Sequence, residues 1–291
     1  MSHVFFLISG ASRGLGRAIT EAALTAGHRV VAGVRSTASL DDLVAGEPER
    51  LAVVELDVTN AEHIRAAVDT ALERWGGRLD VLVNNAGYAN MAAAEDVDFD
   101  DFRAQVETNF FGVVRLTQAV LPVMRSQRAG HIIQISSVGG RLTRPGLAAY
   151  QSSKWAVTGY SGGVVAQEVA PLGIKVTVLE HGGMRTDWAG SSTRIASVRP
   201  EYEATVGAAT QLSQSANLGA SDPVKVAALL MDIVDMEAPP PARLLVGPPD
   251  AYRYATAAGR DLLAADERYE ALSISTAADD ATADQLNPLG A

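Results

Sequence analysis

The amino-acid sequence predicts an α/β protein with a single doubly wound parallel sheet of about seven strands and helices on both faces. Short apolar runs alternate with longer stretches of helical spacing from residue 4 to about residue 180. The short runs are almost continuously apolar, which is typical of strands that are covered on both faces. A helical stretch separates each strand from the next, so crossover connections make neighbouring strands parallel.

The expected strands are short apolar runs bounded by glycine or polar residues. They are Val4–Ser9, Arg29–Val34, Leu51–Leu56, Leu79–Asn84, His131–Ser136, Ile174–Glu180 and Ala242–Val246. The expected helices have apolar residues three and four positions apart. They are Gly14–Ala26, a short helix around Leu40–Val44, Ala61–Trp75, Phe99–Arg125, Ala148–Ala170, Asp222–Met236 and Tyr252–Ala265. Ser221 is expected to cap the helix Asp222–Met236, with Pro223 in its first turn.

The organisation of the chain is expected to be simple. No linker or change of composition divides it, so residues 1–291 are predicted to form a single domain. The segment 185–218 is rich in small and polar residues, and we expect it to bind substrate together with the loop Val138–Leu147. The residues 276–291 are polar and alanine-rich, and we expect them to form a flexible tail.

Composition narrows the classes of function. The formal net charge is −10, whereas nucleic acids and anionic membranes attract basic surfaces. The chain has no cysteine, which excludes disulfides and thiolate chemistry, and its histidines lack metal-ligand spacing, so no metal is expected. The sequence has no apolar run of about 18 residues and no visible signal peptide, so we expect no membrane association and a cytoplasmic location.

A glycine-rich segment joins the first expected strand to the first expected helix. It reads Ser9-Gly10-Ala11-Ser12-Arg13-Gly14-Leu15-Gly16. Glycine lets the backbone approach a pyrophosphate closely, and a helix N-terminus offers free N–H groups to it. The spacing G-x-x-x-G-x-G differs from the fingerprint G-x-G-x-x-G, so an ordinary glycine turn is the alternative. The strand before the segment and the helix after it favour a nucleotide-binding loop.

The end of the second expected strand indicates which nucleotide is bound. NAD sites place an acidic residue about 20 positions after the loop, against the ribose 2′-hydroxyl. This strand instead ends in Gly33-Val34-Arg35. Arg35 and Arg13 could hold a 2′-phosphate from two sides, because guanidinium groups match phosphate geometry. NADP(H) is therefore favoured and NAD(H) stays open; the alternative is that both arginines are solvated surface charges.

A tyrosine and a lysine share one face of an expected helix. Tyr150 and Lys154 are four residues apart. A free tyrosine has a pKa of about 10, and a nearby ammonium lowers it by favouring the phenolate. Such a tyrosine can exchange a proton with a carbonyl or an alcohol during hydride transfer. Ser137, which follows the strand His131–Ser136, is placed to hold the substrate oxygen; a packed tyrosine beside a solvated lysine is the alternative.

Taken together, these residues resemble the short-chain dehydrogenase/reductase family, which has a Rossmann-type fold. The resemblance covers residues 4 to about 187, with the motifs in the family's order and spacing. The matching residues are Gly10–Gly16, Asp57-Val58, Asn84-Asn85-Ala86-Gly87, Asn109, Ser136-Ser137, Tyr150 and Lys154.

The resemblance implies a role for each matching residue. Tyr150 would be the catalytic acid/base, Ser137 would orient the substrate, and Lys154 would bind the nicotinamide ribose and lower the Tyr150 pKa. Asn109 would hold a water in a proton relay behind Lys154. The implied cofactor-binding residues are Gly10, Ser12, Arg13, Gly14, Leu15, Gly16, Arg35, Asp57, Val58, Asn84, Ala86, Gly87, Tyr150, Lys154, Gly182 and Thr186.

One position departs from the family, which usually has Pro-Gly after the sixth strand. This chain has His181-Gly182 and then Gly183-Met184-Arg185-Thr186. Gly182 and Thr186 remain, so we expect the loop to meet the nicotinamide carboxamide. His181 is interpreted as a loop residue rather than as a catalytic group.

The sequence therefore predicts an NADP(H)-dependent oxidoreductase that transfers a hydride between nicotinamide and a carbonyl or a secondary alcohol. The alternatives are an NAD-dependent alcohol dehydrogenase on the same site and a non-catalytic NADP(H)-binding sensor. The expected partner is a small-molecule substrate, whose identity the sequence does not specify. By resemblance, a homodimer or homotetramer would form through the helices at 99–125 and 148–170.

Overall fold

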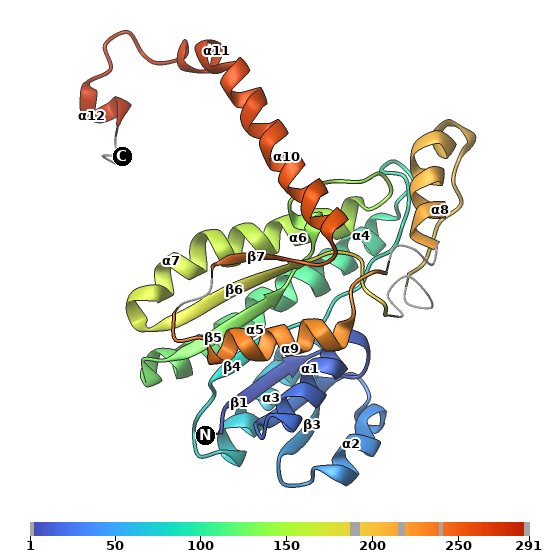
Figure 1. The fold of residues 1–291 in the computed structure, drawn as a ribbon, viewed down its shortest axis with the longest axis vertical. Coiled ribbons are helices and arrows are strands. Elements are labelled where there is room, and N and C mark those ends of the chain that lie inside the picture. The colour runs from blue at the N-terminus through green and yellow to red at the C-terminus, as the bar shows by residue number, and fades with distance from the viewer. Residues whose placement is uncertain (1–2, 187–192, 215–218, 239–240, 288–291) are drawn as a thin grey trace.

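One sheet organises the protein, with strand order β3-β2-β1-β4-β5-β6-β7 and every neighbouring pair parallel (Figure 1). The computed structural model describes residues 3–186, 193–214, 219–238 and 241–287. The strands are β1 (Phe5–Ser9), β2 (Arg29–Val34), β3 (Leu51–Glu55), β4 (Val81–Asn84), β5 (Gly130–Ile135), β6 (Ile174–His181) and β7 (Arg243–Val246). The predicted fold class is confirmed, and each strand lies within about two residues of its predicted bounds.

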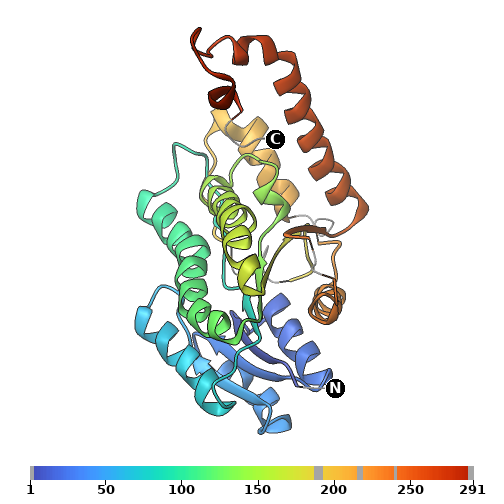
Figure 2. The same ribbon diagram turned by 90° about the vertical axis from the view of Figure 1, so that its left-hand side faces the viewer.

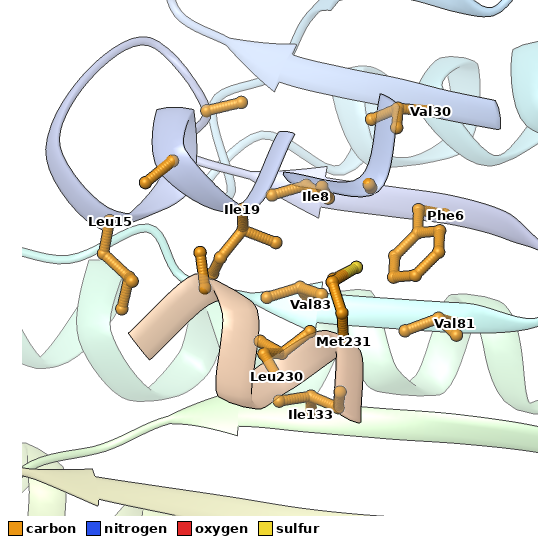
Figure 3. Packing of buried hydrophobic residues seen from close by; sticks show 14 of the residues in the cluster. Phe6, Ile8, Leu15, Ile19, Val30, Val81, Val83, Ile133, Leu230 and Met231 are labelled. Carbon is orange, nitrogen blue, oxygen red and sulfur yellow. The ribbon is translucent and has the colours of Figure 1, made fainter. Parts of the chain in front are cut away.

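Two hydrophobic cores occupy the two faces of the sheet, because side chains alternate in direction along each strand. Phe6 and Ile8 of β1 point into the first core, where Ile19 and Leu230 also pack (Figure 3). That face is covered by α1 (Gly14–Thr25) and α9 (Pro223–Asp235). Leu7, between Phe6 and Ile8, points into the second core. That face is covered by α3 (Ala61–Arg74), α5 (Gly112–Gln127) and α7 (Ala166–Val169).

Two helices that were predicted to be continuous contain π-helical turns. The first consists of α4 (Phe99–Val106), the π turn η2 (Glu107–Phe111) and α5. The second consists of α6 (Ala148–Thr158), the π turn η4 (Gly159–Val165) and α7. The chain is helical throughout both predicted spans, but apolar spacing does not reveal the switch from i→i+4 to i→i+5 hydrogen bonds. The turn η2 contains Asn109, which is completely buried.

Helix α9 begins one residue later than predicted. Its cap is Asp222, whose side chain accepts a hydrogen bond from the Val224 N–H at 2.9 Å. Ser221, the predicted cap, instead forms two hydrogen bonds through its backbone. The Ser221 N–H donates to the Gly183 carbonyl at 3.0 Å, and its carbonyl accepts from the Arg185 N–H at 2.9 Å. Ser221 thus joins the loop after β6 to the start of α9.

The C-terminal region leaves the body of the protein. After β7 the chain enters α10 (Pro249–Arg268), which is longer than the predicted helix Tyr252–Ala265. Ala255 on its inner side is buried, but every residue from Asp261 to Asp280 is exposed. Figures 1 and 2 show α10 projecting away from the sheet, followed by α11 (Glu270–Ile274) and α12 (Ala283–Leu286). The predicted tail 276–291 includes α12 and extends past the described residues, so its flexibility stays a prediction.

The remaining elements are short and connect the main ones. They are η1 (Thr37–Leu40), α2 (Asp41–Gly46), η3 (Val138–Gly140), η5 (Ala170–Leu172), η7 (Pro200–Tyr202), η8 (Glu203–Gly207) and α8 (Ala208–Gln214). Among the described residues, the helices are all too short or too polar to cross a membrane.

Candidate active site

A cavity of about 1530 Å³ opens at the carboxyl ends of the central strands. It lies where the strand order reverses between β1 and β4, the position at which open α/β sheets bind ligands. The predicted site residues that line it are Gly10, Ser12, Arg13, Gly14, Leu15, Arg35, Asp57, Val58, Ala86, Gly87, Ser137, Tyr150, Lys154, Gly182 and Thr186. The cavity therefore brings together most of the residues that the sequence singled out.

Three predicted site residues do not belong to this lining: Gly16, Asn84 and Asn109. The Asn84 amide faces the core, where its Nδ2 donates to Thr117 Oγ1 of α5 at 3.2 Å. Its neighbour Asn85, which belongs to the same motif, lines the cavity instead. The repeated Asn in Asn84-Asn85 hid which of the two residues would face the ligand, because side chains alternate at the end of a strand.

The glycine loop closes on itself and on the end of β4. A Cβ at Gly16 would lie 2.2 Å from the Gly10 carbonyl oxygen, and a Cβ at Gly10 would lie 2.9 Å from Ala86 Cα. Gly10 also has φ +68°, which L side chains rarely adopt. Asn85 Nδ2 donates to the carbonyls of Ser9 at 3.1 Å and Gly10 at 2.9 Å, so it ties the loop to the segment after β4. Glycine is required here for the loop to form at all.

The start of α1 faces the cavity with its backbone. The N-cap residue of α1 is Arg13, which is exposed. Among the described residues, its side chain forms no capping hydrogen bond with the helix. The first N–H groups of the helix are thus available to an anion. Gly14, the first helical residue, has φ +54° and stands beside Thr186, whose Cγ2 would lie 3.3 Å from a Cβ at Gly14.

Arg35 follows β2 directly and lines the cavity with an exposed side chain. Asp57, beyond the end of β3, lies close enough for its charge to interact with Arg35. Burial raises the pKa of Asp57, but hydrogen bonds from the Thr59 N–H and hydroxyl and the Arg35 charge outweigh burial and lower the pKa overall. Asp57 Oδ1 accepts those two hydrogen bonds at 2.8 and 2.7 Å. Asp57 is therefore a charged residue at neutral pH, and Arg35 faces it across this end of the cavity.

Ser137, Tyr150 and Lys154 form one cluster. The Ser137 hydroxyl lies close enough to the Tyr150 hydroxyl to lower its pKa. Lys154 Nζ lies 5.7 Å from the centre of the Tyr150 ring and donates to the Ile135 carbonyl at 2.8 Å. The three side chains are 8%, 6% and 5% exposed, so the cluster is largely screened from water.

Burial controls the protonation of this pair. It raises the pKa of Tyr150 to about 12, although the hydrogen bond with Ser137 partly opposes the rise. It lowers the pKa of Lys154 to about 8. The net pKa of Tyr150 therefore lies above its ordinary value, and the expectation that Lys154 lowers it stays a prediction. Lys154 directs its ammonium to the Ile135 carbonyl, and desolvation of the phenolate dominates.

Asn109 holds the segment after β4 in place. Its Oδ1 accepts from the Tyr88 N–H at 3.0 Å, and its Nδ2 donates to the Tyr88 carbonyl at 2.8 Å and to Ser153 Oγ at 3.2 Å. A Cβ at Gly87 would lie 3.0 Å from Asn109 Oδ1 and 3.8 Å from Lys154 Nζ. Asn109 thus packs behind the cavity wall near Lys154. The water relay that the resemblance implies stays a prediction.

His181, at the position where the family has proline, is half-buried in the wall beside this cluster. Its Nδ1 lies 2.7 Å from the Gly182 carbonyl oxygen, and its own carbonyl accepts from Ser137 Oγ at 3.5 Å. Burial lowers the pKa of His181 to about 4, and the Lys154 charge adds to the effect while the Gly182 carbonyl opposes it. The imidazole is therefore neutral at physiological pH, and its bond to Gly182 restrains the loop.

Arg141, in the loop that was predicted to bind substrate, does not line the cavity. Its Nε donates to Glu180, a carboxylate that is completely buried at the end of β6. Arg243 of β7 donates to the same carboxylate from Nε at 3.0 Å and from Nη2 at 2.7 Å. The loop after Ser137 is thereby fastened to β6 and β7. Arg144 does line the cavity, whereas Trp188 in the predicted substrate segment lies outside the described residues.

The sequence did not predict that α10 would contribute to the site. Its residues Asp250, Ala251, Tyr254, Ala257, Ala258 and Asp261 line the cavity. Their spacing along one face of a helix can be read from the sequence. The residues around them in the sequence do not indicate that this face packs near the glycine loop.

Known proteins resemble this chain over nearly its whole length. The model of the family described as short chain dehydrogenase matches residues 5–195. An oxidoreductase named BOA17 from Botryotinia fuckeliana (strain B05.10) is 52% identical over 279 residues, which are 95% of this chain and all of that protein.

Solved structures share the fold. A short-chain dehydrogenase from Streptomyces avermitilis has a TM-score of 0.88 and 39% identity, covering 95% of this chain and 99% of that one. A short chain dehydrogenase from Burkholderia cenocepacia J2315, solved in complex with NADP, has a TM-score of 0.70 and 25% identity, covering 92% of this chain and 97% of that one. This chain belongs to the short-chain dehydrogenase/reductase family, oxidoreductases that interconvert carbonyl and alcohol groups with a nicotinamide dinucleotide.

Proposed function

We propose that this protein is an NADP(H)-dependent carbonyl reductase in which Tyr150 is the proton donor. The observation that carries the proposal is that Ser137 and Tyr150, whose side chains interact, line the same cavity as the glycine loop. A substrate carbonyl oxygen between the two hydroxyls could accept a hydrogen bond from each of them. It would then be held and protonated at the same place. The single domain, the cytoplasmic location and a homodimer or homotetramer remain predictions.

The residues around the cavity fit a nicotinamide dinucleotide. The glycine loop leads into the start of α1, whose first N–H groups have no side-chain cap. A pyrophosphate could approach the loop backbone closely and accept from these N–H groups. Val58 and Gly87 would border the adenosine half and the nicotinamide ribose. Gly182 and Thr186, in the loop after β6, line the cavity and would meet the carboxamide. When bound, the cofactor would supply the hydride for reduction.

The preference for NADP(H) rests on Arg13 and Arg35. Both side chains are exposed and line the cavity, one before α1 and the other after β2. Two guanidinium groups in these positions would pair with a 2′-phosphate. The position after β2 carries no acid that would bind a free ribose 2′-hydroxyl, as NAD sites require.

Each catalytic group has a separate task in the proposed reaction. Tyr150, with a pKa of about 12, keeps its proton at neutral pH and can give it to the carbonyl oxygen. Ser137 donates a hydrogen bond to the same oxygen and fixes its position. Lys154, with a pKa of about 8, is mostly protonated near pH 7 and stabilises the tyrosinate that remains. Asn109 would hold Gly87 and Tyr88 in register behind Lys154.

The test combines a substrate panel with a cofactor exchange. Purified protein is mixed with aldehydes and ketones in the presence of NADPH or NADH, and the loss of reduced-nicotinamide absorbance is followed. We expect turnover with NADPH to exceed turnover with NADH, and Arg35→Asp to reverse that order. Equal use of both cofactors by the unmodified protein would contradict the NADP(H) preference. Inactivity toward every carbonyl, with both cofactors, would contradict the proposed reaction.

A further inference from the structure

One face of α10 lines the cavity. Ala251, Tyr254, Ala258 and Asp261 recur at intervals of three and four residues, so they project from the same side of the helix. The helix starts directly at the site, because a Cβ at Gly182 would lie 2.7 Å from the Ala251 Cβ. Helix α10 therefore begins beside the residue that follows His181, lines the cavity as far as Asp261, and projects away from the sheet (Figure 1).

The cavity lining outside this helix includes an apolar group of residues. They are Met91, Leu142, Pro145, Leu147, Met184 and Ala209. On α10 itself the alanines at 251, 257 and 258 are small and only partly exposed, so they take up little of the cavity. The cavity volume of about 1530 Å³ exceeds the roughly 300–1,000 Å³ of ordinary small-molecule pockets, so it has room for a substrate beside the dinucleotide that would occupy part of it.

We propose that the substrate is a ketone with an elongated, uncharged apolar chain, and that the α10 face selects for that chain. This proposal rests on the proposed function, because the carbonyl is placed at Ser137 and Tyr150. From Ala251 to Ala258 the helix rises about 10 Å. That length accommodates roughly eight carbon atoms at bond lengths near 1.5 Å.

Charge at the two ends of this face restricts the chain further. Asp250 and Asp261 both line the cavity on α10, one at the beginning of the stripe and one at its outer end. Arg144 and Arg185 also line the cavity, but the charged lining residues on α10 are these two carboxylates, and Asp261 would disfavour a carboxylate at the far end of a chain that lies on this face. An uncharged chain has no such cost and gains free energy from leaving water.

Helix α10 lies outside the segment that defines the family. The family match ends at residue 195, whereas α10 begins at Pro249. The chemistry at Ser137 and Tyr150 and the selection by α10 thus come from different parts of the chain. A change on α10 should alter which ketone is reduced without altering the reduction itself.

The first experiment measures kcat/KM with NADPH for 2-butanone, 2-hexanone, 2-octanone and 2-decanone. For the unmodified protein we expect kcat/KM to rise about two- to fourfold per added carbon, as each methylene leaves water. Ala258→Phe should lower kcat/KM for 2-decanone about tenfold or more, because the ring fills the space for the chain. The same variant should lower kcat/KM for 2-butanone much less than for 2-decanone. Ala264→Phe, on an exposed part of α10, is the matched control and should change neither.

A second measurement does not depend on turnover. Calorimetric titration with 2-decanol should show binding to the unmodified protein and to Ala264→Phe, with about tenfold weaker binding to Ala258→Phe. Equal affinity of all three proteins for 2-decanol, or a kcat/KM that does not depend on chain length, would overturn the assignment of α10. Selective 2-decanol binding together with no reduction of any ketone would support the chain site and contradict the proposed function.

Discussion

Ser137 acts on the Tyr150 hydroxyl and opposes the rise in its pKa, although Ser137 follows the strand β5 and Tyr150 lies in the helix α6. Ser137 also accepts from the Gly139 N–H at 3.1 Å, which holds its side chain in the turn η3. A Cβ at Gly139 would lie 3.4 Å from Ser137 Oγ and 3.6 Å from Tyr150 Cε1. The two hydroxyls are thus positioned by a tight turn on one side and by a buried helix on the other.

Removal of the Tyr150 hydroxyl should abolish reduction and spare cofactor binding. We expect Tyr150→Phe to lower kcat about a thousandfold, within the range for loss of a general acid. Its Kd for NADPH, measured by fluorescence titration, should stay close to that of the unmodified protein. Tyr252→Phe, which changes a tyrosine that is 59% exposed, is the control and should be fully active. A Tyr150→Phe protein with normal kcat would exclude Tyr150 as the proton donor.

Acidification should destabilise the fold through two buried histidines. Burial lowers the pKa of His131 and of His181 to about 4, whereas in the unfolded chain each protonates near pH 6.5. The unfolded state therefore binds more protons as the pH falls, so stability is lost between about pH 6.5 and pH 4. Each shift corresponds to about 3 kcal/mol.

Urea denaturation between pH 4 and pH 7.5 measures this effect. His131→Gln should flatten the dependence of the unfolding free energy on pH by about the contribution of one histidine. His3→Gln changes an exposed histidine and should leave the slope as it is. The idea fails if His131→Gln and the unmodified protein lose stability in parallel over this range.

A methyl group at Gly16 should disrupt the cofactor loop. The added Cβ would lie 2.2 Å from the Gly10 carbonyl oxygen and 2.5 Å from Asn85 Nδ2, so the loop has to shift. We expect Gly16→Ala to weaken NADPH binding at least about tenfold and to destabilise the fold by about 1–3 kcal/mol. Gly259→Ala, in an open part of α10, should instead be neutral or stabilising by up to about 1 kcal/mol. Normal NADPH affinity of Gly16→Ala would show that the loop does not contact the cofactor.

Neutralisation of Glu180 should loosen the loop that carries Ser137. Glu180 is completely buried and holds Arg141 and Arg243, which remain 27% and 39% exposed. Because solvent screens both arginines in part, we expect Glu180→Gln to cost about 2–3 kcal/mol of unfolding free energy, less than a fully buried pair would. The KM for ketones should also rise. Thermal and urea denaturation provide the test, with the exposed Glu201→Gln as control; equal stability of the two variants would contradict the role of Glu180.

Much of the fold was predictable because its signals are local. Each strand is a short apolar run and each long helix an apolar stripe, and both patterns are contained within a few residues of the element itself. The same holds for the main site motifs. The glycine loop lies between consecutive elements, and Tyr150 and Lys154 are one helical turn apart, so sequence spacing alone brings them together.

Other features depend on residues far apart in the sequence. The π turn at Asn109 follows from hydrogen bonds to Tyr88 and Ser153, which no helical pattern contains. Asn85 rather than Asn84 faces the cavity because of how β4 meets the loop after β1. Arg141 forms an ion pair with Glu180. Helix α10 reaches the site only through the packing of Ala251 against Gly182.

The sequence by itself determined the parallel α/β fold, the glycine loop and the Ser137, Tyr150 and Lys154 set, because local periodicity and spacing encode them. Only the tertiary structure decided the protonation of that set and the shape of the substrate end. Burial by segments distant in the chain raises the pKa of Tyr150 and lowers that of Lys154, the reverse of what their spacing alone predicts for the tyrosine. Desolvation depends on everything that surrounds a group, and that surrounding exists only once the chain has folded.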